Sequence, residues 1–432
     1  MREVFIIDGS RTPFIKAAGK PNPLSAADLA VAAAQPLLAR QPFAARNIDE
    51  VIAGCVAPNA NEANIGRIIA LRLGCGHATT GWTVQRNCAS GLQALDCAFK
   101  DITLGRHNLV LAGGTEAMSR APLLLSEDMV AWLAELRLAK NFEAKLKQLL
   151  KFRPKFIVPV ISLLRGLTDP VVNMTMGETA EKLAAKFGIN RQEMDHFAWQ
   201  SQQRAAQSQQ SKNPPTLLLN KPEIAPTFDW CGKVVTTDTG VRTDSTLEKL
   251  ATLKPVFDKP FGSVTAGNSS QISDGAAFLL LASAQAVQEH DLQPIAKIKD
   301  IAWSGLDPSI MGLGPAHAIA KLLQQQRLNL ADIDFWEINE AFAVQVIACV
   351  RALADEQYCK EALGLKQALG TINAAQLNVD GGAIAVGHPV GASGARLALH
   401  VAQLLARNTA QLGIASLCIG GGQGGALLLE RV

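Results

Sequence analysis

The sequence predicts an α/β fold made of two duplicated mixed α/β halves, with a further segment inserted into the first half. Short apolar runs alternate with helical patterns along the chain, which is typical of sheets covered by helices. Several segments near the start recur in the same order near the end, which indicates a duplication. Between the two copies lies a long stretch, residues 120–246, whose composition differs from that of both.

The repeat has three parts in each half. A short apolar run with a leading Ile-Asp pair comes first, a helix that opens with small residues follows, and an apolar run ending in two glycines comes last. The matched segments are 48–52 with 333–337, 88–95 with 391–399, and 110–114 with 415–421. We therefore expect one half to comprise residues 1–119 and 247–283, and the other half residues 284–432.

The inserted stretch contains a basic segment, residues 131–166, with eight Lys and Arg against two Glu. Apolar side chains recur in it at an incomplete helical spacing. A helix with one basic and one apolar face suits an anionic membrane surface, and a helical hairpin packed on its own domain or on a partner subunit is the alternative. The apolar run 156–164 is shorter than the roughly 18 residues of a membrane span. A second insertion, 355–377, has no function that the sequence indicates.

The composition is that of a large globular protein of a reducing compartment. The 432 residues, 48% of them hydrophobic and 18% charged, allow two or more domains with ample core. The formal net charge of +3 gives no indication of nucleic-acid binding. Eight cysteines without disulfide-type clustering favour reducing conditions. Because the first apolar run begins almost at Met1, we expect no signal or transit peptide and a cytoplasmic location.

Cys88 is a candidate nucleophile. It lies where an apolar strand ends and a helix of small residues begins. The unpaired N–H groups and partial positive charge at a helix start favour a thiolate over a thiol. The Ala-Ser-Gly sequence that follows leaves space for a substrate carbonyl. A buried cysteine that acts only as a small hydrophobic residue is the alternative.

Two distant segments favour the nucleophile. His388 lies on a Gly/Pro turn before another small-residue helix, and Cys418 ends an apolar strand that leads into a glycine-rich loop beginning at Gly420. Such a loop lets backbone N–H groups approach an oxyanion closely. Metal binding is the competing use of Cys and His. The chain has no Cys-x-x-Cys and no paired-His spacing, so we expect no metal site.

These motifs resemble the four signature blocks of the thiolases, in the family order. The blocks are Asn87-Cys88-Ala89-Ser90-Gly91, Asn339-Glu340-Ala341-Phe342, Gly387-His388-Pro389-Val390-Gly391 and Cys418-Ile419-Gly420-Gly421-Gly422. Further matches at 8–14, 113–119 and 265–277 extend the resemblance over nearly the whole chain. It implies the five-layer thiolase fold, with central helices starting at Cys88 and near Gly391, and a loop domain, 120–246, that covers coenzyme A.

The resemblance also implies roles in the cleavage of a 3-ketoacyl thioester. Cys88 would attack the ketone, His388 would take its proton, and Cys418 would protonate the departing acetyl-CoA carbanion and then activate CoA. The N–H groups of Cys88 and Gly420 would hold the tetrahedral oxygen, while His388 and a water on Asn339 would face the enolate. A turn or cap residue is the alternative for Asn339, and many long-chain relatives have His there.

Coenzyme A enters this scheme as a substrate, so we expect no cofactor. For its binding the resemblance points to Ser270, Arg242 and Met176. Ser270 lies on a small-residue turn that lets the backbone approach the pantetheine arm. Arg242 would lie near the adenine end, with an ordinary exposed arginine as the alternative. Met176 belongs to the best-matched block of the loop domain, 175–181.

Two features bear on the substrate. Thr175 stands where short-chain, acetoacetyl-specific relatives carry His, and the basic insertion resembles that of the β-subunit of the membrane-associated trifunctional fatty-acid oxidation complex and its bacterial counterparts. We therefore expect degradation of medium- or long-chain 3-ketoacyl-CoA in fatty-acid β-oxidation. We expect a homodimer or a dimer of dimers, with an enoyl-CoA hydratase/3-hydroxyacyl-CoA dehydrogenase subunit and the inner membrane surface as candidate contacts.

Three other functions stay open on the sequence. A biosynthetic acetoacetyl-CoA thiolase would use the same residues in the reverse direction. A ketoacyl-carrier-protein synthase would have a second catalytic His where this chain has Cys418. A non-catalytic lipid carrier or scaffold would tolerate the loss of Cys88, His388 or Cys418, and all three are present.

Overall fold

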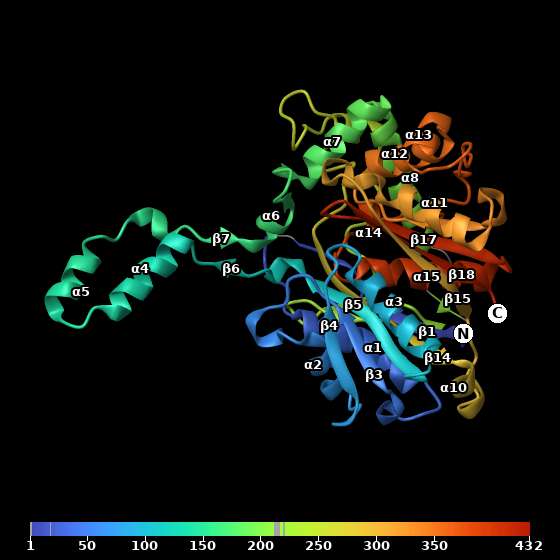
Figure 1. The fold of residues 1–432 in the computed structure, drawn as a ribbon, viewed down its shortest axis with the longest axis horizontal. Helices are drawn as coiled ribbons and strands as arrows, with labels where there is room; N and C mark the ends of the chain where they lie inside the picture. Colours follow the sequence, from blue (N-terminus) through green and yellow to red (C-terminus); the bar gives the residue numbers. More distant parts are fainter. Residues whose placement is uncertain (1, 18, 211–216, 219–220) are drawn as a thin grey trace.

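The computed structural model describes residues 2–17, 19–210, 217–218 and 221–432. Its main sheet joins the two halves of the chain in the order β16-β17-β18-β15-β1-β14-β5-β3-β4, with β2 (Ile15–Lys16) paired to β14 (Figure 1). The strands of the first half are β1 (Val4–Arg11), β14 (Ser273–Ser283), β5 (Leu109–Ala117), β3 (Glu50–Gly54) and β4 (Thr80–Val84). Those of the second half are β15 (Ala296–Gly305), β18 (Gln423–Glu430), β17 (Leu412–Ile419) and β16 (Phe335–Ile338).

The two halves share one strand topology. The pairs β1–β14 and β14–β5 are antiparallel and β5–β3 is parallel, just as β15–β18 and β18–β17 are antiparallel and β17–β16 is parallel. In the first half β4 adds a parallel strand to β3, and in the second half a parallel bridge from Leu377 to Trp336 takes this position. The repeated segments therefore lie on equivalent elements, which confirms the predicted duplication.

Helices complete five layers around these strands. The helices that cover the outer faces are α1 (Ala26–Ala39) and α2 (Ile65–Arg72) on the first half, and α11 (Gly314–Gln326) on the second, with α12 (Ala343–Ala354) packed on it. Between the two sets of strands, α3 (Ser90–Thr103) and α15 (Ser393–Asn408) lie side by side (Figure 1). This is the predicted arrangement, and each central helix begins two residues later than expected.

Glycine allows the two central helices to approach each other closely. A Cβ on Gly91 would lie 2.7 Å from the carbonyl oxygen of Gly391, and one on Gly394 would lie 2.5 Å from the backbone nitrogen of Leu92. Any larger residue at these positions would push the helices apart. The loops that lead into these helices carry Cys88 and His388, so this contact also sets the spacing of the two loops.

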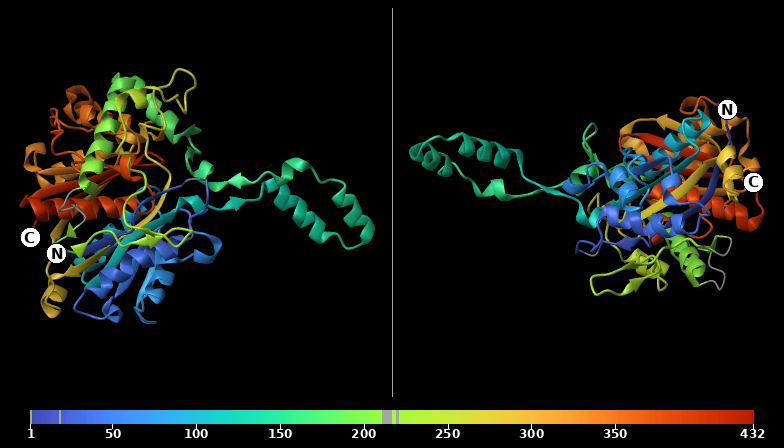
Figure 2. Two further views of the ribbon diagram at one scale, coloured as in Figure 1. Left: turned by 180° about the vertical axis from the view of Figure 1, so that it is seen from behind. Right: turned by 90° about the horizontal axis from the view of Figure 1, so that it is seen from below.

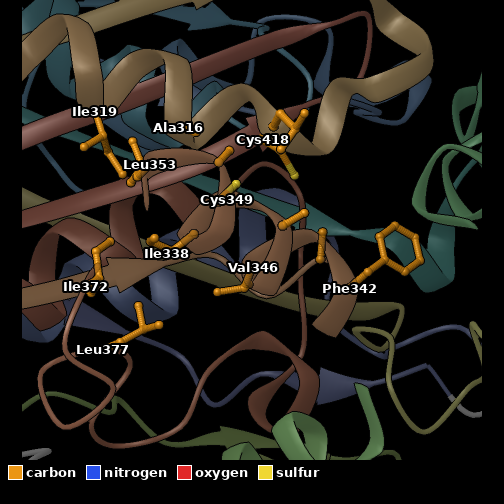
Figure 3. Packing of buried hydrophobic residues seen from close by; sticks show 14 of the residues in the cluster. Ala316, Ile319, Ile338, Phe342, Val346, Cys349, Leu353, Ile372, Leu377 and Cys418 are labelled. Atoms are coloured by element: carbon orange, nitrogen blue, oxygen red, sulfur yellow. The ribbon is translucent and has the colours of Figure 1, made fainter. Parts of the chain in front are cut away.

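The core of the second half is an apolar cluster that reaches the end of β17. Side chains from α11, β16 and α12 meet in it, among them Ile319, Ile338 and Val346 (Figure 3). Cys418, the last residue but one of β17, and Cys349 of α12 both belong to this cluster and are buried. Apolar side chains therefore surround the Cys418 thiol.

The inserted segment packs its helices on the second half. α7 (Met176–Phe187) and α8 (Arg191–Gln210) contribute Leu183, Met194 and Ala198 to the same apolar cluster. The other elements between the halves are β8 (Thr168–Asp169), β9 (Met174–Thr175), β10 (Leu217–Leu218), β11 (Lys221–Pro222), β12 (Thr227–Phe228), β13 (Val234–Val235) and α9 (Leu247–Ala251). Residues 211–216 and 219–220 of the predicted loop domain lie outside the described residues. Short helices elsewhere are α10 (Ala284–Glu289), α13 (Glu356–Glu361) and α14 (Ala383–Val386).

Residues 123–161 form an arm that extends away from the body of the protein (Figures 1 and 2). The arm consists of the ribbon β6 (Leu123–Leu124) with β7 (Val160–Ile161), the helices α4 (Glu127–Leu138) and α5 (Phe142–Leu149), and the 3₁₀ turn η4 (Pro154–Ile157). Trp132 joins the helices, because its indole N–H donates to the Gln148 carbonyl and its ring contacts Phe152. α6 (Ser162–Gly166) follows the arm and returns the chain to the body.

Residues 131–166 do not form one continuous helix with a basic and an apolar face, because the segment folds as a helical hairpin, the shape of the alternative. Its apolar side chains do not pack on the inserted domain either: Leu138, Phe142 and Leu150 are 75%, 81% and 79% exposed. The reason is that the ribbon carries the hairpin away from the body, and α4 buries none of its side chains. In the described part of the chain, no helix combines the length and the apolar character that a membrane crossing needs.

Candidate active site

Cys88 lies in a tight loop between β4 and α3. Asn87, the preceding residue, has a φ of 44°, a left-handed conformation that asparagine adopts more readily than most residues. Ser90 closes the loop, because its hydroxyl accepts the Arg86 N–H at 2.9 Å and donates to the Asn87 carbonyl at 2.7 Å. The Arg86 guanidinium lies over the Trp303 ring of β15, 4.1 Å from the ring centroid. The loop therefore has one well-defined conformation.

The Cys88 side chain is half-buried, and the backbone N–H groups of Gly420 and of Cys88 itself donate toward its sulfur. Burial raises the pKa of the thiol, the two N–H groups lower it by less, and the carboxyl group of Glu116 raises it further. The prediction that the helix start favours a thiolate is therefore wrong for the resting protein. Cys88 precedes the first helical residue by two positions, and desolvation outweighs the effect of the donors.

Gly420 comes from the second half of the chain and lies beside Cys88. It opens the loop between β17 and β18, in which Gly421 and Gly422 have φ values of 91° and 75°. The side-chain amide of Asn87 donates to the Gly420 carbonyl at 2.8 Å. The predicted oxyanion donors, the N–H groups of Cys88 and Gly420, are thus brought together at one sulfur atom.

Cys418 is buried in the apolar cluster of the second half, as Figure 3 shows. Burial raises its pKa well above the usual value for a thiol, and the nearby Cys88 and Cys349 thiols raise it further. Cys418 is therefore a neutral thiol at neutral pH.

His388 is buried between the two halves with its tautomer defined by Ser393. The Ser393 hydroxyl donates to the Pro389 carbonyl at 3.0 Å, so it accepts a hydrogen bond from the Nδ1–H of His388 at 2.6 Å. Nε2 is then free to accept, and it lies 3.4 Å from the side-chain amide of Asn339. Burial lowers the pKa of His388 to about 4, with a further contribution from the positive charge of Arg396. His388 is thus neutral at physiological pH and can take up a proton at Nε2.

Asn339 is buried directly after β16, and its Oδ1 has no hydrogen-bond partner in the described part of the structure. The alternative that Asn339 caps a helix is wrong, because the following helix, α12, has Phe342 at its N-terminal cap position. Glu340 next to it accepts hydrogen bonds from Ser201 and Asn378, which fixes this segment. An unpaired buried acceptor beside His388 is consistent with the predicted water at Asn339.

A pocket opens at Cys88, and its walls come from seven parts of the chain. Most lining side chains are apolar, and among the described residues no Lys or Arg lines the pocket. The lining residues are Val56, Ala57, Asn87, Cys88, Glu116, Met118, Ala121, Ser162, Leu163, Gly166, Leu167, Met176, Val390 and Gly420. Met176, one of the residues predicted to bind coenzyme A, is therefore close to Cys88. Leu163 and Gly166 belong to α6, so the root of the arm forms one wall.

Ser270 and Arg242, the other residues predicted to bind coenzyme A, do not line this pocket. Ser270 is half-buried and donates its N–H to the Ala341 carbonyl at 2.9 Å. The next residue, Gln271, accepts the His388 N–H at 3.1 Å, so the Ser270 turn lies against the loops of Asn339 and His388. Arg242 is exposed, and its backbone N–H donates to the Gln202 side chain at 2.8 Å.

Two residues of the site had no role in the sequence prediction. The first is Asn87, described with the Cys88 loop. The second is Glu116, which is buried at the end of β5. Its carboxyl group accepts the backbone N–H groups of Val56, Ala57 and Gly391, and burial raises its pKa to about 7. A glutamate at the end of an apolar strand is a signal that could have been noticed in the sequence. The hydrogen bond from Asn87 to Gly420 joins residues 333 positions apart, and no local pattern indicates it.

The fold and this site define the family, and sequence comparison agrees. The thiolase N-terminal domain model matches residues 4–285 and the thiolase C-terminal domain model matches residues 292–431. The chain therefore belongs to the thiolase family. Members of this family are acyltransferases, acting as acetyl-CoA C-acyltransferases, and the chain is an enzyme of this class.

Individual relatives are similar over their whole length but differ in the substrates they are named for. A β-ketoadipyl-CoA thiolase of Acinetobacter baylyi is 39% identical over 100% of both chains. A 3-ketoacyl-CoA thiolase of Yersinia enterocolitica is 33% identical over 99% of this chain and 96% of that one. Human mitochondrial 3-ketoacyl-CoA thiolase in complex with CoA matches the structure with a TM-score of 0.83, at 35% identity, over 100% of this chain and 98% of that one. An acetyl-CoA acetyltransferase of Bacillus anthracis matches with a TM-score of 0.84, at 36% identity, over 100% and 99%.

Proposed function

We propose that this enzyme is a 3-ketoacyl-CoA thiolase that cleaves medium- or long-chain 3-ketoacyl-CoA with CoA, as a cytoplasmic step of fatty-acid β-oxidation. The products are acetyl-CoA and an acyl-CoA shortened by two carbons. The observation that carries the proposal is the apolar pocket at Cys88, which has no cationic lining residue.

In the first half-reaction the Cys88 sulfur attacks C3 of the substrate as its proton moves to His388 Nε2. The transfer occurs during the attack, since both groups are neutral at rest. The N–H groups of Cys88 and Gly420 donate to the new alkoxide oxygen, which forms beside the sulfur. Collapse of this adduct breaks the C2–C3 bond and leaves the shortened acyl group on Cys88. The enolate of acetyl-CoA takes a proton from the Cys418 thiol, while His388 and a water held by Asn339 donate to its oxygen.

In the second half-reaction CoA replaces acetyl-CoA. The Cys418 thiolate, left by the first half-reaction, removes the proton of the CoA thiol. The CoA sulfur attacks the thioester on Cys88, and the Cys88 sulfur leaves and recovers its proton from His388. Ser270 and Arg242 bind CoA at its pantetheine and adenine ends, and Met176 borders the reacting thioester. Atoms and protons balance over the proposed cycle, which therefore requires no cofactor.

The pocket supports an apolar acyl chain over a dicarboxylate. A ketoadipyl group carries a second carboxylate at the far end of its chain. In this pocket that carboxylate would meet Met118, Leu163 and Leu167. In the described part of the chain, the ionisable groups that line the pocket are the Glu116 carboxyl group and the Cys88 thiol. Burying an unpaired charge among apolar groups is strongly unfavourable. The higher identity to thiolases named for β-ketoadipyl-CoA makes that substrate the second candidate.

A substrate panel tests this proposal. We expect kcat/KM for 3-ketododecanoyl-CoA to exceed that for 3-ketoadipyl-CoA by about tenfold or more. Leu163→Arg adds a cation to the pocket wall and should lower the first value and raise the second. Leu164→Arg is the matched control, because Leu164 is 57% exposed and does not line the pocket. A wild-type preference for 3-ketoadipyl-CoA or for acetoacetyl-CoA would overturn the chain-length assignment.

We also propose that the arm attaches the enzyme to another component, either an anionic membrane surface or a hydratase–dehydrogenase subunit. Two features of the arm support this. Its apolar side chains are exposed, and among its basic residues Arg137, Lys140 and Lys145 have no ion pair within the described structure. The candidate active site lies in the body of the protein, so catalysis does not need this exposed apolar and basic surface on the arm.

The test removes residues 127–157 and closes the arm with a short Gly-Ser linker. This deletion leaves Ser162 and Leu163 of the pocket wall in place. We expect unchanged turnover of short ketoacyl-CoA, with weaker flotation on anionic liposomes or weaker pull-down of the partner subunit. Leu150→Asp on the arm should act like the deletion, while Leu104→Asp, at an exposed position of the body, should not. Binding by the deletion variant as strong as that of wild type would contradict the proposed role.

A homo-oligomer is the third part of the proposal. β4 lies at the edge of the main sheet, and a half-buried Trp82 lies on it. An exposed strand edge offers unpaired backbone groups to a second copy. Light scattering should give the mass of a dimer or of a dimer of dimers, and Thr83→Pro on this edge should favour the monomer. A wild-type monomer at micromolar concentration would contradict this part.

A further inference from the structure

Asn87 has contacts with both halves of the site. It lies next to Cys88 in the loop of the first half, and its side chain lines the pocket. Its amide Nδ2 donates to the carbonyl oxygen of Gly420, in the loop of the second half, at 2.8 Å. The residue therefore links the loop of the candidate nucleophile to the loop of the second oxyanion donor.

Gly420 is held at both of its backbone polar groups. Its N–H donates toward the Cys88 sulfur, and its carbonyl accepts from Asn87. The two residues that follow, Gly421 and Gly422, both have positive φ, and glycine restrains the backbone less than any other residue. The far end of the loop is fixed by the Leu306 N–H, which donates to the Gly422 carbonyl at 2.8 Å. At the near end the Asn87 amide fixes the direction of the Gly420 peptide groups.

We propose that Asn87 is a positioning residue for acyl transfer: by holding the Gly420 carbonyl it aims the Gly420 N–H at the sulfur in the resting enzyme and at the alkoxide oxygen after attack. The inference rests on the proposed thiolase chemistry at Cys88. As the Cys88 S–C3 bond forms, the carbonyl π electrons move to the oxygen, and the donor must already point there. A donor fixed in advance needs no reorganisation during the reaction.

Asparagine meets two requirements at this position. It tolerates the left-handed conformation at φ 44°, and it carries a donor of suitable length for the Gly420 carbonyl. Glycine would keep the conformation and lose the donor. Aspartate would keep the conformation and the size, but it would turn an acceptor and a negative charge toward the carbonyl oxygen. Both substitutions therefore keep the backbone conformation of residue 87 and remove the hydrogen bond, so their effects report on the hydrogen bond alone.

The experiment compares Asn87→Gly and Asn87→Asp with wild type. We expect kcat to fall by about 10- to 100-fold in Asn87→Gly, with a change in KM of less than about threefold, because a misaimed oxyanion donor weakens transition-state binding. Asn87→Asp should lose at least as much. Because the same N–H also stabilises the thiolate, the pH profile of Cys88 alkylation by iodoacetamide should shift upward in both variants.

Asp291→Gly is the matched control, since it also removes a left-handed residue, with φ 49°, at an exposed position. It should keep wild-type kcat and alkylation. Wild-type kcat in folded Asn87→Gly would overturn the inference. An unshifted alkylation profile together with a lowered Tm would also overturn it, because the residue would then be only structural. If wild type cleaves no 3-ketoacyl-CoA, the proposed function fails, and the alkylation profile still tests the positioning.

Discussion

The two halves of the duplicated fold bring different chemistry to the same site. The loop before α3 in the first half carries Cys88, and the equivalent loop before α15 in the second half carries His388. The second half also supplies Cys418 and Asn339. In the proposed mechanism, one backbone unit thus provides the nucleophile in one copy and the groups that transfer protons in the other. The difference shows that the side chains, and the degree of burial around them, decide the task of each loop.

The contrast is clearest between the two cysteines. Cys88 is half-buried at a pocket with two N–H donors toward its sulfur, whereas Cys418 is 1% exposed in an apolar cluster. Burial raises both pKa values, and it raises that of Cys418 well above the usual range. Cys88 has a donor from a second loop, Gly420, whereas in the described structure only the N–H of Cys418 itself donates toward the Cys418 sulfur. The more deeply buried Cys418 thiol therefore holds its proton more firmly than Cys88 does. Substitutions at each site test this contrast.

The largest effect is expected at Cys88. Cys88→Ala removes the sulfur that forms the thioester, so kcat should fall by at least about 10⁴-fold, as for other enzymes that lose a nucleophile. Steady-state loss of 3-ketoacyl-CoA absorbance measures this. Cys97→Ala, which removes another half-buried thiol of the same region, is the control and should stay near wild type. If kcat fell as much in Cys97→Ala as in Cys88→Ala, the result would contradict the assignment of Cys88 as the nucleophile.

A smaller loss is expected at Cys418. Cys418→Ser keeps the size but raises the pKa by several units, so proton transfer to and from carbon should slow by about a hundredfold or more. Iodoacetamide should still label Cys88 in this variant. Cys349→Ser, in the same apolar cluster, should cleave at nearly the wild-type rate. Near-normal turnover by Cys418→Ser would mean that another residue carries the proton.

The smallest effect concerns Glu116 and depends on pH. Burial raises its pKa to about 7, so it is mostly neutral below that pH and negative above it. Its negative charge raises the pKa of Cys88, and Glu116→Gln removes the charge. Above pH 7 alkylation of Cys88 should therefore be faster in the variant, by about two- to fivefold, and the difference should vanish as the pH falls below 7. A constant rate ratio from pH 5 to 9 would show that Glu116 does not affect this thiol.

The sequence predicted the parts of this molecule that local pattern determines. The repeated segments, the strand that ends before Cys88 and the glycine loop after Cys418 follow from residue type and spacing within a few positions. The direction of the Cys88 pKa shift could not be predicted in this way, because it depends first on burial by segments that are distant in the sequence, and then on Gly420 and Glu116. The left-handed conformation of Asn87 and its hydrogen bond to Gly420 were also not predicted, because the bond joins two loops that are far apart in the sequence.

The arm shows a second limit of sequence reasoning. The mixture of basic and apolar residues in 131–166 indicated helix, and α4 and α5 are helical. The direction of the β6–β7 ribbon decides whether other parts of the protein cover the apolar side chains of the arm. This ribbon pairs only two residues of each strand. Periodicity carries no information on that direction. It also did not indicate that α6, at the root of the arm, lines the pocket at Cys88.

The central claim is that Cys88 alone forms the covalent intermediate. Intact-protein mass spectrometry after mixing the enzyme with 3-ketodecanoyl-CoA, without added CoA, tests it most directly. The account predicts one octanoyl group on the wild-type protein, located on the peptide that contains Cys88, and its removal when CoA is added. It predicts no such group on Cys88→Ala. An octanoyl group that persists in Cys88→Ala, or one found on Cys418 in the wild type, would contradict the account.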